Sequence, residues 1–131
     1  MIGWALLILR VSLGVVFVAH GLQAAFGMFS GPGINGFSKM LAGLGFNPAL
    51  LWAYIGAYTE LLGGLFVLLG IFPRIASVFI LIFMSVALFK VHLAKGLFIQ
   101  AGGFEYNFVL ICICLVLIIL GAGKFSVFNK F

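Results

Sequence analysis

Six residues of this chain combine a hydrogen-bonding or ionisable side chain with a position in or beside an apolar stretch. They are His20, Gln23, Glu60, His92, Lys95 and Glu105. Imidazole and carboxyl groups exchange protons near neutral pH when their surroundings favour it, and both also bind metals. We therefore take these six residues as candidates for a polar site that binds a ligand or relays protons.

The spacing of the reactive residues argues against several kinds of centre. No predicted helix carries two His, Asp or Glu residues three or four positions apart, so we expect no metal site. Cys112 and Cys114 are two positions apart and lack the C-x-x-C spacing of a dithiol motif. The chain also lacks the glycine pattern of a dinucleotide site. We therefore predict no intrinsic cofactor, so that electrons in any redox reaction must be carried by a partner.

Composition places these candidate residues in a membrane. Of the 131 residues, 66% are hydrophobic and 7% are charged, whereas about a quarter of a soluble domain is charged. So few charged residues cannot cover a domain of this size in water. The basic residues stand singly along the chain, so the net charge of +5 does not indicate nucleic-acid binding. The length suits one domain, and we predict a single domain over residues 1–131 in a lipid bilayer.

Four apolar stretches approach the roughly 20 residues that a bilayer crossing needs. They cover residues 3–26, 48–70, 73–94 and 105–121. The connection between the second and third stretches is so short that these helices must form an antiparallel hairpin. The sequence therefore predicts an all-α integral membrane protein, a four-helix antiparallel bundle. A short amphipathic helix on the membrane surface is expected from the spacing of Phe37, Met40, Leu41 and Leu44.

Helical spacing gathers small residues on one face of each of the first two spans. The first face holds Gly3, Arg10, Gly14, Phe17, Gly21 and Ala24, and the second holds Ala53, Gly56, Ala57, Glu60, Gly63 and Gly64. Small residues allow close approach of helices in membranes, so both faces should point into the bundle. Because an unpaired charge is costly at that depth, we predict a buried ion pair between Arg10 and Glu60. Its role, as a structural clamp or as part of the site, stays open.

The remaining candidates converge on the end of the bundle away from the termini. We expect His20, Gln23, His92, Lys95 and Glu105 to line a pocket that opens there, with Glu60 as its deepest member. Plainer roles stay open, since a membrane histidine can be a structural hydrogen-bonding group and Glu105 can stabilise a helix N-terminus. Lys90 projects from the other side of its helix and is expected to reach the lipid headgroups.

Several short motifs follow one another along the chain. They are His20-Gly21-Leu22-Gln23 with Gly27, Glu60-Leu61-Leu62-Gly63-Gly64 with Gly70, Arg74-Ile75-Ala76, His92 with Lys95-Gly96, and Gly102-Gly103-Phe104-Glu105-Tyr106. In this order and spacing the chain resembles the DoxX family of small four-span bacterial membrane proteins over essentially its whole length. One departure is that Ala24 and Ala25 stand where the family often has a lysine.

The resemblance implies a bacterial plasma membrane and a connection to redox chemistry, because some relatives are subunits of thiosulfate:quinone oxidoreductase. Together with the polar residues it predicts a membrane subunit of a quinone-linked redox system, with a membrane quinone as ligand and a redox partner subunit. A non-catalytic scaffold or assembly subunit is the first alternative, and transport of a small solute or a proton is the second. Whether the chain is itself an enzyme and whether it forms a homo-oligomer stay open.

An even number of spans places both termini on the same side of the membrane. The basic residues near the span ends divide evenly between the two sides. Arg10 then tips the prediction towards cytoplasmic termini, since basic residues favour the cytoplasmic side.

Overall fold

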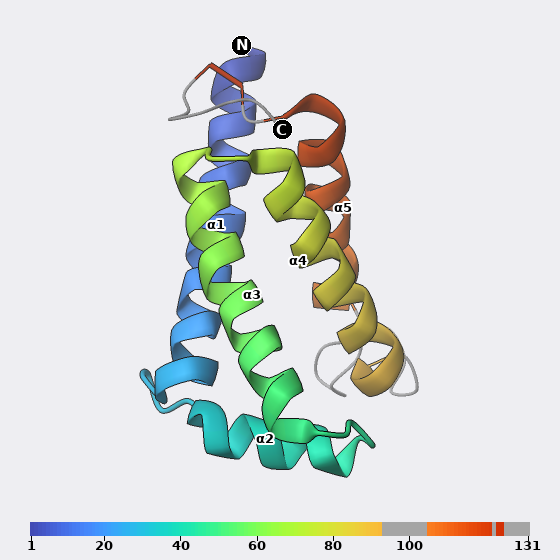
Figure 1. Cartoon of the computed structure of the whole chain (residues 1–131). Helices are drawn as coiled ribbons and strands as arrows, with labels where there is room; N and C mark the ends of the chain where they lie inside the picture. The colour runs from blue at the N-terminus through green and yellow to red at the C-terminus, as the bar shows by residue number, and fades with distance from the viewer. Residues whose placement is uncertain (93–104, 122, 125–131) are drawn as a thin grey trace.

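A computed structural model describes residues 1–92, 105–121 and 123–124. The elements in this part are α1 (Ile2–Phe26), α2 (Gly33–Gly43), α3 (Ala49–Leu69), α4 (Pro73–Ala87), the π-helical turn η1 (Leu88–His92) and α5 (Glu105–Leu120). Helices α1, α3, α4 and α5 run along a common long axis, and α2 crosses one end of the bundle (Figure 1). We call this end the α2 end and the opposite one the N-terminal end. The predicted all-α fold is confirmed.

Three of these helices are long and apolar enough to cross a membrane. They are α1, α3 and the continuous segment Pro73–Lys90 formed by α4 and most of η1. Helix α5 has 16 residues, which corresponds to about 24 Å, against about 30 Å for the hydrocarbon core of a bilayer. The membrane helical bundle is thus confirmed, whereas a fourth full-length span is not. The predicted last residues of the third span, 93–94, lie outside the described residues.

Glycines bring α1 and α3 into very close contact, as their small-residue faces predicted. A Cβ atom added to Gly21 would lie 2.5 Å from the backbone nitrogen of Leu61, and one added to Gly64 would lie 2.8 Å from that of Val18. Contact between α1 and α3 is the most extensive between any two described elements. Only residues without a side chain fit where two backbones approach so closely.

The same contacts fix the register of the two helices and bear on the predicted ion pair. Gly21 lies beside Leu61 and Gly14 beside Leu68, so Glu60 is near the level of Gly21. Arg10 lies eleven residues before Gly21, about 16 Å along the axis at 1.5 Å per residue. Both side chains are buried, at 1% exposure for Arg10 and 9% for Glu60, but this separation argues against an ion pair between them.

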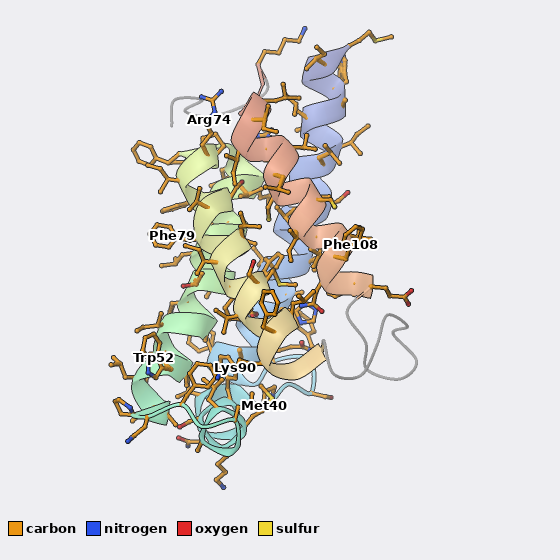
Figure 2. The ribbon with its side chains drawn as sticks, turned by 90° about the vertical axis from the view of Figure 1, so that its right-hand side faces the viewer. Met40, Trp52, Arg74, Phe79, Lys90 and Phe108 are labelled. Carbon is orange, nitrogen blue, oxygen red and sulfur yellow. The ribbon has the colours of Figure 1, made fainter. Side chains whose placement is uncertain are left out.

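A hydrogen bond from Arg74 stabilises the N-terminal end of the bundle. At the N-terminal end, Arg74 Nε donates a 3.0 Å hydrogen bond to the carbonyl oxygen of Ile118, which joins the start of α4 to the end of α5. A cation there also suits the negative end of the helix dipole. Figure 2 shows Arg74 at this end and Met40, Trp52 and Lys90 gathered at the other. The Arg74 hydrogen bond fixes the start of α4 against the end of α5.

Helix α2 closes the opposite end with its apolar face. Phe37 and Leu41 are buried and pack in one cluster with small residues of α1 and α3, whereas Lys39 and Met40 are exposed. The predicted short helix is present, and two of the four residues predicted for its apolar face, Phe37 and Leu41, are buried, whereas Met40 is exposed by 52%. Its position on the membrane surface stays a prediction. Helix α2 forms one wall of the space described next.

Candidate functional site

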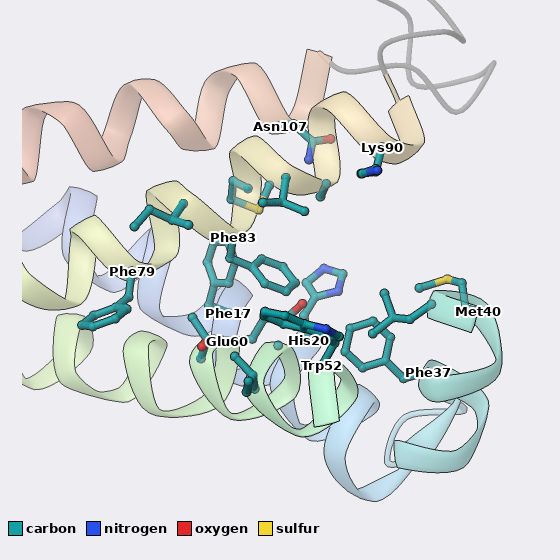
Figure 3. A pocket seen from close by; sticks show the side chains of 18 of the residues that line it. Phe17, His20, Phe37, Met40, Trp52, Glu60, Phe79, Phe83, Lys90 and Asn107 are labelled. Atoms are coloured by element: carbon teal, nitrogen blue, oxygen red, sulfur yellow. The ribbon is translucent and has the colours of Figure 1, made fainter. Parts of the chain in front are cut away.

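A cavity of about 700 Å³ lies near the α2 end of the bundle, with walls from all five α-helices (Figure 3). Its volume is within the range of roughly 300–1,000 Å³ that is typical of ligand sites. Most of the lining is apolar, and much of it is aromatic. The aromatic hydrocarbon rings belong to Phe17, Phe37, Phe46, Phe79 and Phe83, and the indole of Trp52 joins them.

A small set of polar side chains also lines the cavity. They are His20 of α1, Thr59 and Glu60 of α3, Lys90 of η1, and Tyr106 and Asn107 of α5. A mostly apolar pocket with a few polar groups is the usual form of a small-molecule site. Among the described residues no three His, Cys, Asp or Glu side chains gather as metal ligands.

Among the described residues that line the cavity, Glu60 is the most buried ionisable side chain. It lies near the middle of α3 and is 9% exposed. Within the described part of the chain, its Oε2 atom is buried without a hydrogen-bond partner. Leaving a buried polar atom unsatisfied costs about 1–3 kcal/mol. A ligand that presents a polar group to Glu60 would remove this cost.

Tyr106 and His20 form a loose pair beside Glu60. The Tyr106 hydroxyl oxygen lies 3.5 Å from Nε2 of His20, and the two ring centroids are 6.2 Å apart. This hydrogen bond is longer than the usual 2.5–3.0 Å of a hydroxyl donor, so it is weak. Glu60 lines the same cavity as both residues. Helices α1, α3 and α5 therefore contribute one polar cluster to the cavity.

The opening of the cavity has two chemically different borders. At the α2 end, Lys90 Nζ lies 5.8 Å from the ring centroid of Phe46, within reach of a cation–π contact. Between α3 and α4 the border is apolar, with Ile55, Phe79 and Ile82 exposed by 46%, 57% and 56%. Because these side chains face lipid in a membrane, the cavity is accessible from the hydrocarbon layer.

The structure brings together only part of the predicted site. His20 and Glu60 line the cavity, but Gln23 does not, because its Nε2 donates to the carbonyl oxygen of Phe29 at 3.3 Å in the loop after α1. Glu105 is half-buried at the start of α5 and does not line the cavity either. Lys95 and the side chain of His92 lie outside the described residues, so both remain predictions.

Thr59 and Lys90 were not among the predicted site residues. Tyr106 and Asn107 begin the fourth predicted span and were expected near the same end of the bundle, but not among the residues that line the pocket. Asn107 carried a usable signal, since an amide inside an apolar stretch needs a polar environment, and it is 3% exposed here. Lys90 was expected to act as an interfacial anchor. It is exposed, as an anchor would be, but it also borders the cavity.

Two comparisons with known proteins find a match. The model of the DoxX family matches residues 5–93. Over 111 residues the chain is 33% identical to a Bacillus subtilis (strain 168) protein named "Putative oxidoreductase CatD", an alignment that covers 85% of this chain and 76% of that protein. The comparison with solved structures finds no match. The extent of the family match, over most of α1 to η1, shows that this membrane protein belongs to the DoxX family.

Proposed function

We propose that the cavity binds the headgroup of a membrane quinone and that the chain is the membrane subunit of a quinone-linked redox system. The observation that carries the proposal is that Oε2 of Glu60, at the wall of a mostly apolar cavity, has no hydrogen-bond partner among the described residues. A quinone headgroup is a flat, apolar ring with two oxygen atoms, so it needs aromatic walls and a few hydrogen-bonding groups. The oxidoreductase named among the relatives supports a redox role.

Each polar residue has a role in this proposal. A bound quinone would accept or release electrons together with protons. Tyr106, His20 and Asn107 present hydrogen-bond donors to its oxygen atoms, and Glu60 Oε2 accepts a hydrogen bond or a proton from the hydroxyl group of the reduced form. The aromatic walls exclude water, which strengthens these polar contacts. Electrons pass to or from a redox centre on a partner subunit.

The proposal also covers the membrane in which the chain lies and its orientation there. We place the chain in the bacterial plasma membrane with its termini on the cytoplasmic side, so that α2 and the mouth beside Lys90 lie near the outer surface. A Lys39→Cys variant, compared with the parent chain, tests this orientation. A membrane-impermeant thiol reagent applied to whole cells should label it, and labelling only after lysis contradicts the orientation.

Quinone binding by a Glu60→Leu variant tests the function directly. The protein is placed in lipid nanodiscs and titrated with a quinone that has a short tail. We expect the variant to bind at least about tenfold more weakly, since a hydrogen bond to a charged or buried group contributes roughly 1.5–3 kcal/mol. The parent chain purified gently from membranes should carry quinone detectable by mass spectrometry.

Ser77→Ala is the matched control. Ser77 is 0% exposed, and its Oγ atom is also buried without a hydrogen-bond partner in the described part, but it does not line the cavity. This variant should bind quinone as the parent chain does. If the parent chain neither carries nor binds quinone, the proposal is wrong. A stable protein partner without a small molecule would then favour the scaffold role.

A further inference from the structure

A shallow apolar groove runs along the outside of the bundle between α3 and α4. Its volume is about 430 Å³. Two small residues, Gly63 and Ala76, are buried at its base, whereas Leu62, Phe66 and Ile75 are exposed by 47%, 38% and 48%. In a membrane these exposed side chains face the hydrocarbon layer. We call this feature the outer groove.

The outer groove continues from the cavity. Ile55, Thr59 and Phe79 line both spaces. Figure 3 shows Phe79 at the end of the cavity that lies away from Met40 and α2. From Ile55 the groove follows α3 to Phe66, eleven residues or about 16 Å at 1.5 Å per residue. A linear apolar chain that leaves the cavity beside Phe79 therefore enters the groove directly.

We infer that the outer groove holds the isoprenoid tail of the ligand whose headgroup occupies the cavity. This inference rests on the proposed function and adds a second, separate part to the binding site. The two spaces differ as the two parts of such a ligand differ. The cavity contains the polar cluster around Glu60, whereas Tyr58 and Thr59 are the only groove-lining residues with polar side chains among those described.

The other way out of the cavity suits a tail poorly. At the α2 end the border includes Lys90, and α2 itself has an exposed Lys39 on its outer face. Charged side chains at the end of a membrane protein lie in the headgroup and water layer. A long apolar tail directed there would be exposed to water, which is unfavourable. The groove keeps the same tail inside the hydrocarbon layer.

Tail-length dependence of binding tests the groove. The probes are a quinone without a tail and one with a long isoprenoid tail, each added to the full chain in phosphatidylcholine nanodiscs. A Leu62→Trp variant places a bulky ring in the groove. We expect it to bind the long-tail quinone about fivefold more weakly than the parent chain, because a chain displaced from the groove loses many small dispersion contacts.

Leu65→Trp is the matched control, because Leu65 is on the same helix, is 38% exposed and lines neither space. It should bind both quinones as the parent chain does. The tail-free quinone should bind Leu62→Trp normally, which also shows that this variant is folded. Ile75→Trp repeats the test from α4 if Leu62→Trp does not fold.

The outcomes separate the two proposals. If Leu62→Trp or its α4 counterpart binds the long-tail quinone as tightly as Leu65→Trp does, the groove does not hold the tail, although the proposed function stands. If the parent chain binds neither quinone, the proposed function fails and the groove inference fails with it. If the groove variant loses affinity for the long-tail quinone but binds the tail-free quinone as the parent chain does, both the proposed function and the groove inference are supported.

Discussion

Glycines of α1 and α3 have opposite effects in two regions of the molecule. At the α1–α3 interface, glycines let one backbone lie against another, so that a Cβ atom on Gly21 would be 2.5 Å from backbone atoms of Leu61. At the cavity, a Cβ atom on Gly56 would meet the ring ends of Phe83 and Phe37 at 3.1 and 3.2 Å. In the first region the glycines bring two helix backbones into contact. In the second, a glycine leaves space in the cavity beside aromatic rings. The comparison shows that the structural role of a glycine depends on whether backbone atoms or side-chain atoms lie opposite it.

The largest effect is expected from Gly21→Ala. The added methyl group overlaps backbone atoms of α3 that cannot move without shifting the whole helix. Overpacking usually costs 1–3 kcal/mol, and we expect a loss in stability near the upper end, about 3 kcal/mol. Thermal unfolding of the detergent-purified protein and the yield of folded chain measure it.

Gly43→Ala is the control for that substitution. Gly43 ends α2 and has no atom within 4 Å of the position of an added Cβ. Alanine is better than glycine in a helix by up to about 1 kcal/mol, so this variant should be as stable as the parent chain or slightly more. Equal stability of Gly21→Ala and Gly43→Ala would mean that α1 and α3 are not in close backbone contact.

A smaller effect on stability is expected from Gly56→Ala. The neighbouring ring ends can give way by small rotations, so the loss should stay below about 1 kcal/mol. The same rotations narrow the cavity, and we expect affinity for a short-tail quinone to fall about fivefold. Thermal unfolding and quinone titration in nanodiscs measure the two quantities. A loss of stability as large as that of Gly21→Ala would remove the distinction between the two regions.

Sequence periodicity predicted the interior faces well because each face belongs to a single helix. Of the six residues predicted for the first face, five are buried and Gly3 is half-buried. The five are Arg10, Gly14, Phe17, Gly21 and Ala24. The six residues predicted for the second face are all buried, Glu60 among them. Such faces depend only on the 100° rotation per residue, which the sequence contains.

The register between helices was not predictable in this way. The Arg10–Glu60 ion pair was inferred from depths counted separately from the ends of two helices. The actual register follows from the contact of Gly21 with Leu61, which no single-helix pattern contains. The contact of Gln23 was not predictable for a different reason, because its side chain donates to the nearby carbonyl of Phe29, in a loop whose path the helical pattern does not contain. The cavity was not predictable either, because it depends on where α2 lies. The direction of α2 is set by turns at Gly27, Gly33 and Gly45, which have positive φ angles.

The smallest effect is expected from Tyr106→Phe. Its hydroxyl contact to His20, at 3.5 Å, is weak, so we expect the stability to change by less than about 0.5 kcal/mol. The hydroxyl nevertheless points to the cluster around Glu60, and its loss should lower quinone affinity about threefold. Tyr54→Phe is the matched control, since Tyr54 is 47% exposed and does not line the cavity. If the two variants bind quinone equally, the headgroup does not contact the Tyr106 hydroxyl, and its polar contacts must come from Glu60, His20 and Asn107.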